Sequence, residues 1–485
     1  MNGAMIVYIL GQVLRIEGLL MLPSFLVGLI YQEPQGWIYL IWGAVCFGLG
    51  TLITLRKPQN TMIYLKEGCV STALCWIVLS AFGAVPFVLT GEIPRFIDAM
   101  FETVSGFTTT GSSILTDVEA MSHPSLFWRS FTHWIGGMGV LVFLLAVLPM
   151  AGGSQFQLMK AESPGPSVGK LVPKVGATAR LLYVIYFVMT IVEIVLLILG
   201  GMDVFESITH SFGTAGTGGF GVKADSIAGY GPYLQWVITI FMILFGVNFN
   251  AYYFILLGRL RKALGMEEVR WYFVIIFAST TIIFATLLDT YAPFEALTHA
   301  AFQVGSIITT TGFATADFDQ WNSLAKTVLV LLMFIGACAG STGGGIKVSR
   351  VIVLVKSAFR EIGSYIHPRS VNRIRMEGRV IETEAIRSIN VYLTAYVMIF
   401  VVSILLISME GKELITSFTS VAATFNNIGP GLNIVGPTGN FSSFTDFSKW
   451  VLIFDMLAGR LELFPMLILF HPTIWKQAFQ RRARR

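Results

Sequence analysis

The run Thr309-Thr-Thr-Gly312-Phe313 ends a short apolar stretch that is too short to cross a bilayer. Comparing the chain with itself finds three related runs, at 107–113, 216–220 and 425–431. Aligned on one glycine each, every run follows a predicted half-helix and precedes a long apolar segment. We therefore predict a unit of span, half-helix, glycine loop and span that occurs four times.

The repeats organise nearly the whole chain, because only the first two apolar segments stand outside them. The predicted division is two extra N-terminal spans (1–67), pore repeat 1 (68–179), pore repeat 2 (180–270), pore repeat 3 with a gating loop (271–387), and pore repeat 4 with a basic tail (388–485).

Composition indicates a membrane protein. Of 485 residues, 54% are hydrophobic and 13% are charged, with a mean hydropathy of +0.72, whereas soluble domains carry about 25% charged residues. We predict an all-α polytopic membrane protein with ten long apolar segments, around 5–29, 37–55, 69–91, 124–150, 180–201, 233–258, 271–288, 324–357, 388–409 and 448–470.

Charge placement predicts the orientation. With a cytoplasmic N-terminus, the inner segments 56–67, 151–180, 259–270, 350–387 and 476–485 hold 24 of the 33 Lys and Arg. Sixteen of the 28 acidic residues lie outside, against six basic ones. Such a surface concentrates cations at the outer mouth, although simple segregation of basic residues to the inside would also produce it.

The glycine runs predict a pore. Irregular backbone at membrane depth is tolerated where it is buried or lines a cavity, and four loops around one axis can replace the hydration shell of a cation with carbonyl oxygens. Four ordinary turns in the same register are a weaker explanation. Acidic residues near the half-helix N-termini suit the helix dipole, whose negative end then points inward: Asp98, Asp203, Glu295 and Glu413.

These motifs resemble the Trk/Ktr/HKT superfamily of potassium transporters, in particular its bacterial TrkH type. The resemblance covers essentially the whole chain and implies a pseudo-fourfold, potassium-selective pore, with glycine at Gly111 favouring potassium over sodium. Potassium is then the substrate, and no cofactor is expected. The implied potassium-binding filter consists of Thr109, Thr110, Gly111, Thr217, Gly218, Gly219, Thr310, Thr311, Gly312, Asn427, Ile428 and Gly429. The neighbouring Gly218 leaves the register of repeat 2 open by one residue.

The eighth apolar segment contains a glycine-rich stretch from Gly336 to Lys347. Glycine costs about 1 kcal/mol in a helix interior, so a continuous helix is improbable, although small residues also allow close helix packing. The resemblance implies an intramembrane loop that obstructs the pore below the filter. The predicted gate residues are Gly336, Gly340, Gly343, Gly344, Gly345, Lys347 and Arg460.

Arg460 lies deep in the last apolar segment, where charge is costly and commonly functional. The resemblance implies that it faces the pore and contacts the repeat 3 loop, where it would oppose cation leak. Pairing with Asp455 or Glu462 to hold helices together remains the alternative. Lys347 could add to the barrier or extend to the inner surface.

The basic inner residues in 350–387 and the tail Arg481–Arg485 form a basic surface that suits anionic lipid. The resemblance implies that it also docks a cytosolic TrkA-type nucleotide-binding gating subunit, and that the protein is a homodimer. The expected location is the bacterial inner membrane, multi-pass, with both termini cytoplasmic and no nucleic-acid partner.

Three functions therefore remain open. A gated potassium channel ranks first, and a proton- or sodium-coupled potassium symporter, which needs titratable groups on the pathway, ranks second. Glu193, Asp455 and Glu462 are the deep acids, and none lies in a glycine run. A membrane enzyme or receptor ranks third, because the six histidines lack metal-ligand spacing. We expect no enzymatic activity.

Overall fold

The computed structural model describes residues 1–60, 62–139, 175–368, 373–472 and 474. Regular structure in this part of the chain is helical apart from one short antiparallel pair, β1 (Arg375–Met376) and β2 (Arg379–Val380). This agrees with the predicted all-α membrane fold.

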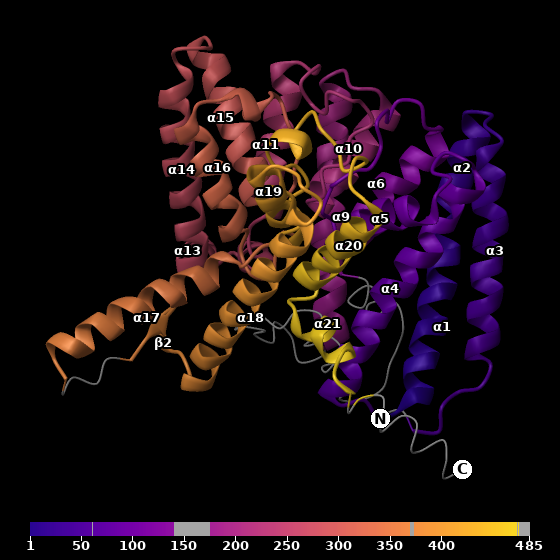
Figure 1. Ribbon diagram of the computed structural model, residues 1–485, viewed down its shortest axis with the longest axis horizontal. Coiled ribbons are helices and arrows are strands. Elements are labelled where there is room, and N and C mark those ends of the chain that lie inside the picture. The colour runs from indigo at the N-terminus through magenta and orange to yellow at the C-terminus, as the bar shows by residue number, and fades with distance from the viewer. Residues whose placement is uncertain (61, 140–174, 369–372, 473, 475–485) are drawn as a thin grey trace.

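The helices follow one another along the chain as an N-terminal pair of spans, built from three helices, and four further groups (Figure 1). The N-terminal helices are α1 (Gly3–Leu20), α2 (Leu22–Ile30) and α3 (Gln35–Thr54). Repeat 1 holds α4 (Leu65–Leu89), α5 (Phe96–Phe107) and α6 (His123–Gly137). Repeat 2 holds α9 (Val175–Leu199), α10 (Val204–Gly216), α11 (Pro232–Phe245), α12 (Phe249–Leu256) and α13 (Leu260–Leu264). Repeat 3 holds α14 (Glu267–Leu287), α15 (Pro293–Ile308), η1 (Phe318–Gln320), α16 (Ser323–Ile335) and α17 (Val348–Ile366). Repeat 4 holds α18 (Thr383–Ser408), α19 (Leu414–Phe425), η2 (Asn433–Val435), α20 (Asp446–Arg460) and α21 (Phe464–Leu469).

The first span of every repeat is a continuous helix. By length and composition, six helical segments of the described chain can cross a membrane: Gly3–Ile30, Gln35–Thr54, Leu65–Leu89, Arg180–Leu199, Glu267–Leu287 and Thr383–Ser408. These are the N-terminal pair and the first spans of the four repeats.

The second spans differ from the sequence prediction, which expected a break only in repeat 3. In repeat 2, α11 and α12 meet at an angle of 92°, because the Asn248 side chain caps a new helix just after Gly246. In repeat 4, the chain leaves α20 through Glu462 and Leu463, which both have positive φ. Continuous second spans in these repeats were therefore a wrong expectation. In repeat 1, α6 ends at Gly137, and the rest of the predicted span (140–150) lies outside the described residues.

The half-helices α5, α10, α15 and α19 lie in the half of the molecule away from α17 and the N-terminus (Figure 1). Each has an acidic residue in its first turn or at its N-cap, as the helix dipole favours. Asp203 also caps α10 directly, since its side chain accepts a hydrogen bond of 2.9 Å from the Phe205 N–H.

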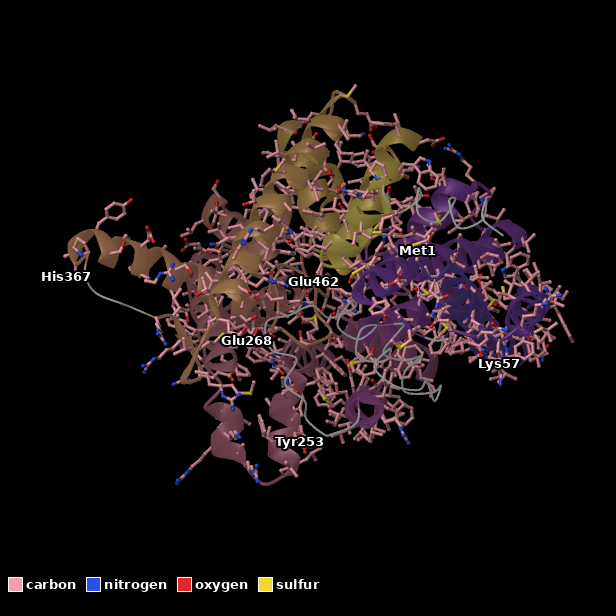
Figure 2. The ribbon with its side chains drawn as sticks, turned by 90° about the horizontal axis from the view of Figure 1, so that it is seen from below. Met1, Lys57, Tyr253, Glu268, His367 and Glu462 are labelled. Carbon is pink, nitrogen blue, oxygen red and sulfur yellow. The ribbon has the colours of Figure 1, made fainter. Side chains whose placement is uncertain are left out.

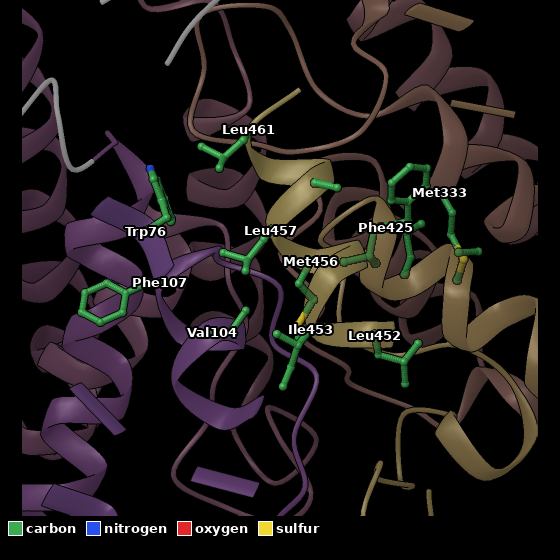
Figure 3. Close-up of a cluster of buried hydrophobic side chains, with 14 of the residues drawn as sticks. Trp76, Val104, Phe107, Met333, Phe425, Leu452, Ile453, Met456, Leu457 and Leu461 are labelled. Carbon is green, nitrogen blue, oxygen red and sulfur yellow. The ribbon is translucent and has the colours of Figure 1, made fainter. Parts of the chain in front are cut away.

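A buried apolar cluster joins the first repeat to the last (Figure 3). Trp76 of α4 and Phe107 of α5 belong to this cluster, and α20 contributes Ile453, Met456 and Leu457. All five side chains are less than 4% exposed or fully buried. This packing brings the two ends of the repeat series together, so the repeats close into a ring.

Candidate functional site: a ring of four glycine loops

The four glycine loops share one backbone conformation. Each has a residue with positive φ, namely Thr109, Thr217, Thr310 or Asn427, and two positions later a glycine with positive φ, namely Gly111, Gly219, Gly312 or Gly429. A β-branched residue in this region is strained, and strain of this kind persists mainly at functional sites. In three of the four loops, the residue with this strained positive φ is a threonine.

Each half-helix ends in the same hydrogen bond. The N–H of the residue before the glycine donates to a carbonyl five residues back, at 2.8 Å in every repeat: Thr110 to Ser105, Gly218 to Gly213, Thr311 to Ser306 and Ile428 to Ala423. With the left-handed residue before it, this is a Schellman closure. It aligns Gly219, rather than Gly218, with the other three glycines.

The loops touch in cyclic order. A Cβ added to Gly111 would lie 2.0 Å from the Gly218 carbonyl oxygen, and one added to Gly219 would lie 2.0 Å from that of Thr311. At Gly312 the Ile428 oxygen would be 2.0 Å away, and at Gly429 the Thr110 oxygen would be 2.9 Å away. Repeat 1 thus contacts repeat 2, then 3, then 4, and repeat 4 returns to 1. Glycine is required here because a neighbouring backbone fills the space of a side chain.

Side chains tie the closing contact between repeats 4 and 1. Asn427 Nδ2 donates to Thr110 Oγ1 at 2.9 Å, and Ser112 Oγ donates to the Gly429 carbonyl at 3.0 Å. Behind repeat 4, the Tyr396 hydroxyl donates to Asn426 Oδ1 at 2.9 Å. The twelve predicted filter residues therefore lie together. Nine of them are buried, and the glycines Gly111, Gly219 and Gly312 are partly exposed.

Two supports of the ring were not predicted from the sequence. The Glu102 carboxylate pairs with Arg129 at 2.6 Å, with both side chains at most 5% exposed, and Arg129 also donates to the Gly221 carbonyl at 2.9 Å. His133 lies between repeats 1 and 2, with Nδ1 2.7 Å from the Gly106 carbonyl and Nε2 accepting from the Phe220 N–H at 3.3 Å. Both join groups far apart in sequence, so no local pattern marks them.

The outer loop of repeat 2 illustrates the acidic character of that side. Lys223 lies 3.2 Å from Glu206 and over the ring of Tyr230. Burial raises the pKa of the Tyr230 hydroxyl, and the carboxylates of Glu206, Asp225 and Asp203 raise it further. Negative charge therefore dominates locally even beside a lysine.

The predicted gating loop is not helical between α16 and α17. Gly336, Gly340 and Gly345 have positive φ, which ends α16 and rules out a continuous helix packed through small residues. The Gly344 N–H donates to Thr310 Oγ1 at 2.6 Å, and a Cβ on Gly343 would lie 2.9 Å from the Thr309 carbonyl oxygen. The loop therefore lies directly against the glycine loop of repeat 3, which holds predicted filter residues.

Arg460 links this loop to repeat 1. Its guanidinium donates to the Thr342 carbonyl at 2.9 Å and to the Gly136 and Gly137 carbonyls at 2.6 and 2.8 Å. Asp455 instead accepts from Ser403 Oγ at 2.7 Å, and Glu462 pairs with Arg350. Contact between Arg460 and the repeat 3 loop was the expectation drawn from the family resemblance.

Lys347 folds back onto the loop, where its ammonium donates to the Gly343 carbonyl, rather than extending to the inner surface. Of the predicted basic surface, Lys356 pairs with Glu267 and donates to the Arg375 carbonyl at 2.8 Å. Segment 151–174, Arg369 and the tail Arg481–Arg485 lie outside the described residues.

Comparison with known proteins identifies the family. The model of the TrkH family, described as "Cation transport protein", matches residues 38–477. The chain belongs to the TrkH family of cation transport proteins. This confirms the resemblance to the bacterial TrkH type.

Relatives of this TrkH-family chain match it along nearly its whole length. The Trk system potassium uptake protein TrkH of Escherichia coli K12 is 36% identical over 476 residues, covering 96% of this chain and 97% of the relative. The Trk system potassium uptake protein TrkG of the same strain is 32% identical, covering 97% and 98%. The crystal structure of the potassium transporter TrkH from Vibrio parahaemolyticus superposes with a TM-score of 0.88 at 33% identity, covering 98% of this chain and 100% of that one. The TrkH-family chain is thus a multi-pass membrane protein of a transporter family, not of an enzyme family.

Proposed function

We propose that this protein takes up potassium through the ring formed by its four glycine loops, in a channel-like manner. The observation that carries the proposal is the closed cyclic contact of Gly111, Gly219, Gly312 and Gly429 with neighbouring backbone carbonyls. Its relatives are named potassium uptake proteins, and rings of carbonyls are the means by which proteins replace the hydration shell of potassium. Potassium is the substrate, held by the twelve filter residues.

The glycine-rich loop between α16 and α17 closes the pathway in this proposal. The position of the loop supports this role. The Gly344 N–H donates a hydrogen bond to the filter threonine Thr310, and Arg460 donates one to the carbonyl of Thr342. A guanidinium at this depth also opposes entry of a cation. The loop therefore acts as the gate, and opening requires it to leave the filter.

The proposed setting is the bacterial inner membrane, with both termini cytoplasmic and the basic inner residues facing anionic lipid. The relatives are named as potassium uptake proteins of a Trk system. We propose that this protein likewise forms a homodimer, and that a cytosolic TrkA-type nucleotide-binding subunit releases the loop.

Flux in liposomes tests the proposal. Purified full-length protein is reconstituted with a potassium gradient, with and without an opposing proton or sodium gradient. We expect the potassium gradient alone to drive flux, with potassium passing faster than sodium. Flux that follows the proton or sodium gradient would instead support the coupled symporter. The deep acids to examine are then Glu193, which is fully buried, Asp455, bonded to Ser403, and Glu462, paired with Arg350.

A further inference from the structure

Glu268 is a buried carboxylate beneath the gating loop. It lies in the first turn of α14 and is 2% exposed. Seen from below, Glu268 and Glu462 lie near the middle of the molecule, whereas Lys57 and His367 lie toward opposite edges (Figure 2). A carboxylate at such a position is costly unless hydrogen bonds satisfy it.

Donors from three different segments satisfy the carboxylate. Oε1 accepts from the Ala339 N–H at 2.6 Å and from the Ser349 N–H at 3.1 Å. Oε2 accepts from Asn248 Nδ2 at 3.2 Å. Ala339 lies near the start of the gating loop, and Ser349 lies in the first turn of α17 just after the loop. One oxygen atom therefore holds both ends of the loop.

The third donor brings in another repeat. Asn248 caps α12 at the sharp bend of the repeat 2 second span, and the neighbouring Phe249 N–H donates to the Gly340 carbonyl at 3.0 Å. Glu268 thus joins the bend of repeat 2 to the base of the repeat 3 loop. Arg460 and Thr310 contact the loop farther along, at Thr342 and Gly344.

We propose that Glu268 is the latch of the gate: a positioning residue that keeps the loop under the filter by bonding its two ends at once. The physical reason is that a displacement that moves both ends of the loop breaks both backbone bonds. The buried Oε1 then has no donor, which is more costly than losing an ordinary hydrogen bond. The latch rests on the proposed function, because it regulates the loop to which we assign gating.

A native cysteine allows the position of the loop to be measured without measuring transport. Cys338 precedes Ala339 in the loop and is fully buried. The other three cysteines of the chain, Cys46, Cys69 and Cys75, are replaced by alanine to give a background in which a thiol reagent reports only the loop. Labelling of full-length protein in detergent is followed by intact-mass spectrometry.

The test variant is Glu268→Gln, which keeps the size of the side chain but replaces one acceptor oxygen with a donor. The matched control is Glu267→Gln, because Glu267 neighbours Glu268 in sequence but pairs with Lys356 of α17. Labelling of Cys338 reports the open population when opening is fast. We expect labelling about tenfold faster in Glu268→Gln, the shift produced by losing one charge-assisted hydrogen bond, and unchanged labelling in the control.

A second variant, Asn248→Ser, keeps the proposal testable if Glu268→Gln does not fold. Serine still caps α12 but is too short to serve as the same donor, so we expect a smaller acceleration. Unchanged labelling in both well-folded variants, or equal acceleration in Glu267→Gln, overturns the latch. Faster labelling in Glu268→Gln without higher potassium flux supports the latch and counts against the loop as the gate, so the two proposals fail separately.

Discussion

Replacing Arg460 with alanine should raise the basal potassium leak of the purified protein. In the structure, the guanidinium donates hydrogen bonds to Thr342, Gly136 and Gly137 at 2.9, 2.6 and 2.8 Å. Of these three bonds, the one to Thr342 reaches the gating loop, so it is the one of the three that resists displacement of the loop. Alanine removes the bond together with the positive charge beneath the filter.

The size of the effect follows from that single bond. A hydrogen bond to a charged group contributes about 1.5–3 kcal/mol, which corresponds to a roughly 10- to 150-fold shift in the equilibrium between blocked and unblocked loop. We therefore expect the leak of Arg460→Ala to exceed that of the parent protein by roughly tenfold or more. Arg460→Lys separates tether from barrier, because lysine keeps the charge but lacks the planar fork that reaches several carbonyls.

The assay is potassium flux from loaded liposomes without any cytosolic partner. Arg15→Ala is the matched control, since Arg15 is an arginine of the membrane helix α1 that bonds Gln12 at 3.3 Å. If the leak of Arg460→Lys is low, the higher leak of Arg460→Ala comes from the loss of the positive charge. If the leak of Arg460→Lys is high, it comes from the loss of the hydrogen bond to Thr342. A leak of Arg460→Ala equal to that of the parent refutes the reasoning.

Three further predictions concern the ring and its supports. Gly111→Ser should reduce discrimination of potassium over sodium in liposome flux, because its Cβ meets a carbonyl of the next loop at 2.0 Å; unchanged permeability ratios would count against the filter. Deleting Gly336–Gly345 should give flux without a partner, whereas a deletion that folds and stays closed would contradict the gate. Glu102→Gln should lower the free energy of unfolding by about 3–5 kcal/mol by leaving Arg129 buried and unpaired, measured as thermal stability in detergent. Arg95→Gln, at an exposed ion pair with 58% of the arginine side chain accessible, is its control and should cost less than about 1 kcal/mol.

The sequence predicts the repeat well because its strongest signals are local. A half-helix followed by a threonine-rich or glycine-rich run is a contiguous pattern, and the glycine of each run is required by the backbone itself. The equivalence of Gly219 with Gly111 could not be settled from spacing alone, since Gly218 is adjacent. The shared positive φ and the common 2.8 Å closure bond decide it.

Features that depend on distant partners were beyond prediction. The pairing of Glu102 with Arg129 joins groups 27 residues apart, and the bonds of Glu268 reach 71 and 81 residues along the chain. The bend of 92° between α11 and α12 also interrupts an apolar segment that reads as a continuous span. Hydropathy records that such a segment is buried in lipid or protein, but it carries no information about which way the helix axis runs.

The cyclic contact of four unlike loops has a consequence for how a pore can be closed. Had four identical chains formed the ring, any loop placed beneath the filter would occur four times, and the copies would compete for the same space on the axis. A single chain escapes this constraint, since the glycine-rich break after α16 and Arg460 of α20 each occur in one repeat. In the proposed function, the covalent linkage of the repeats thus permits a gate in which one arm blocks the path while the other three serve as its frame.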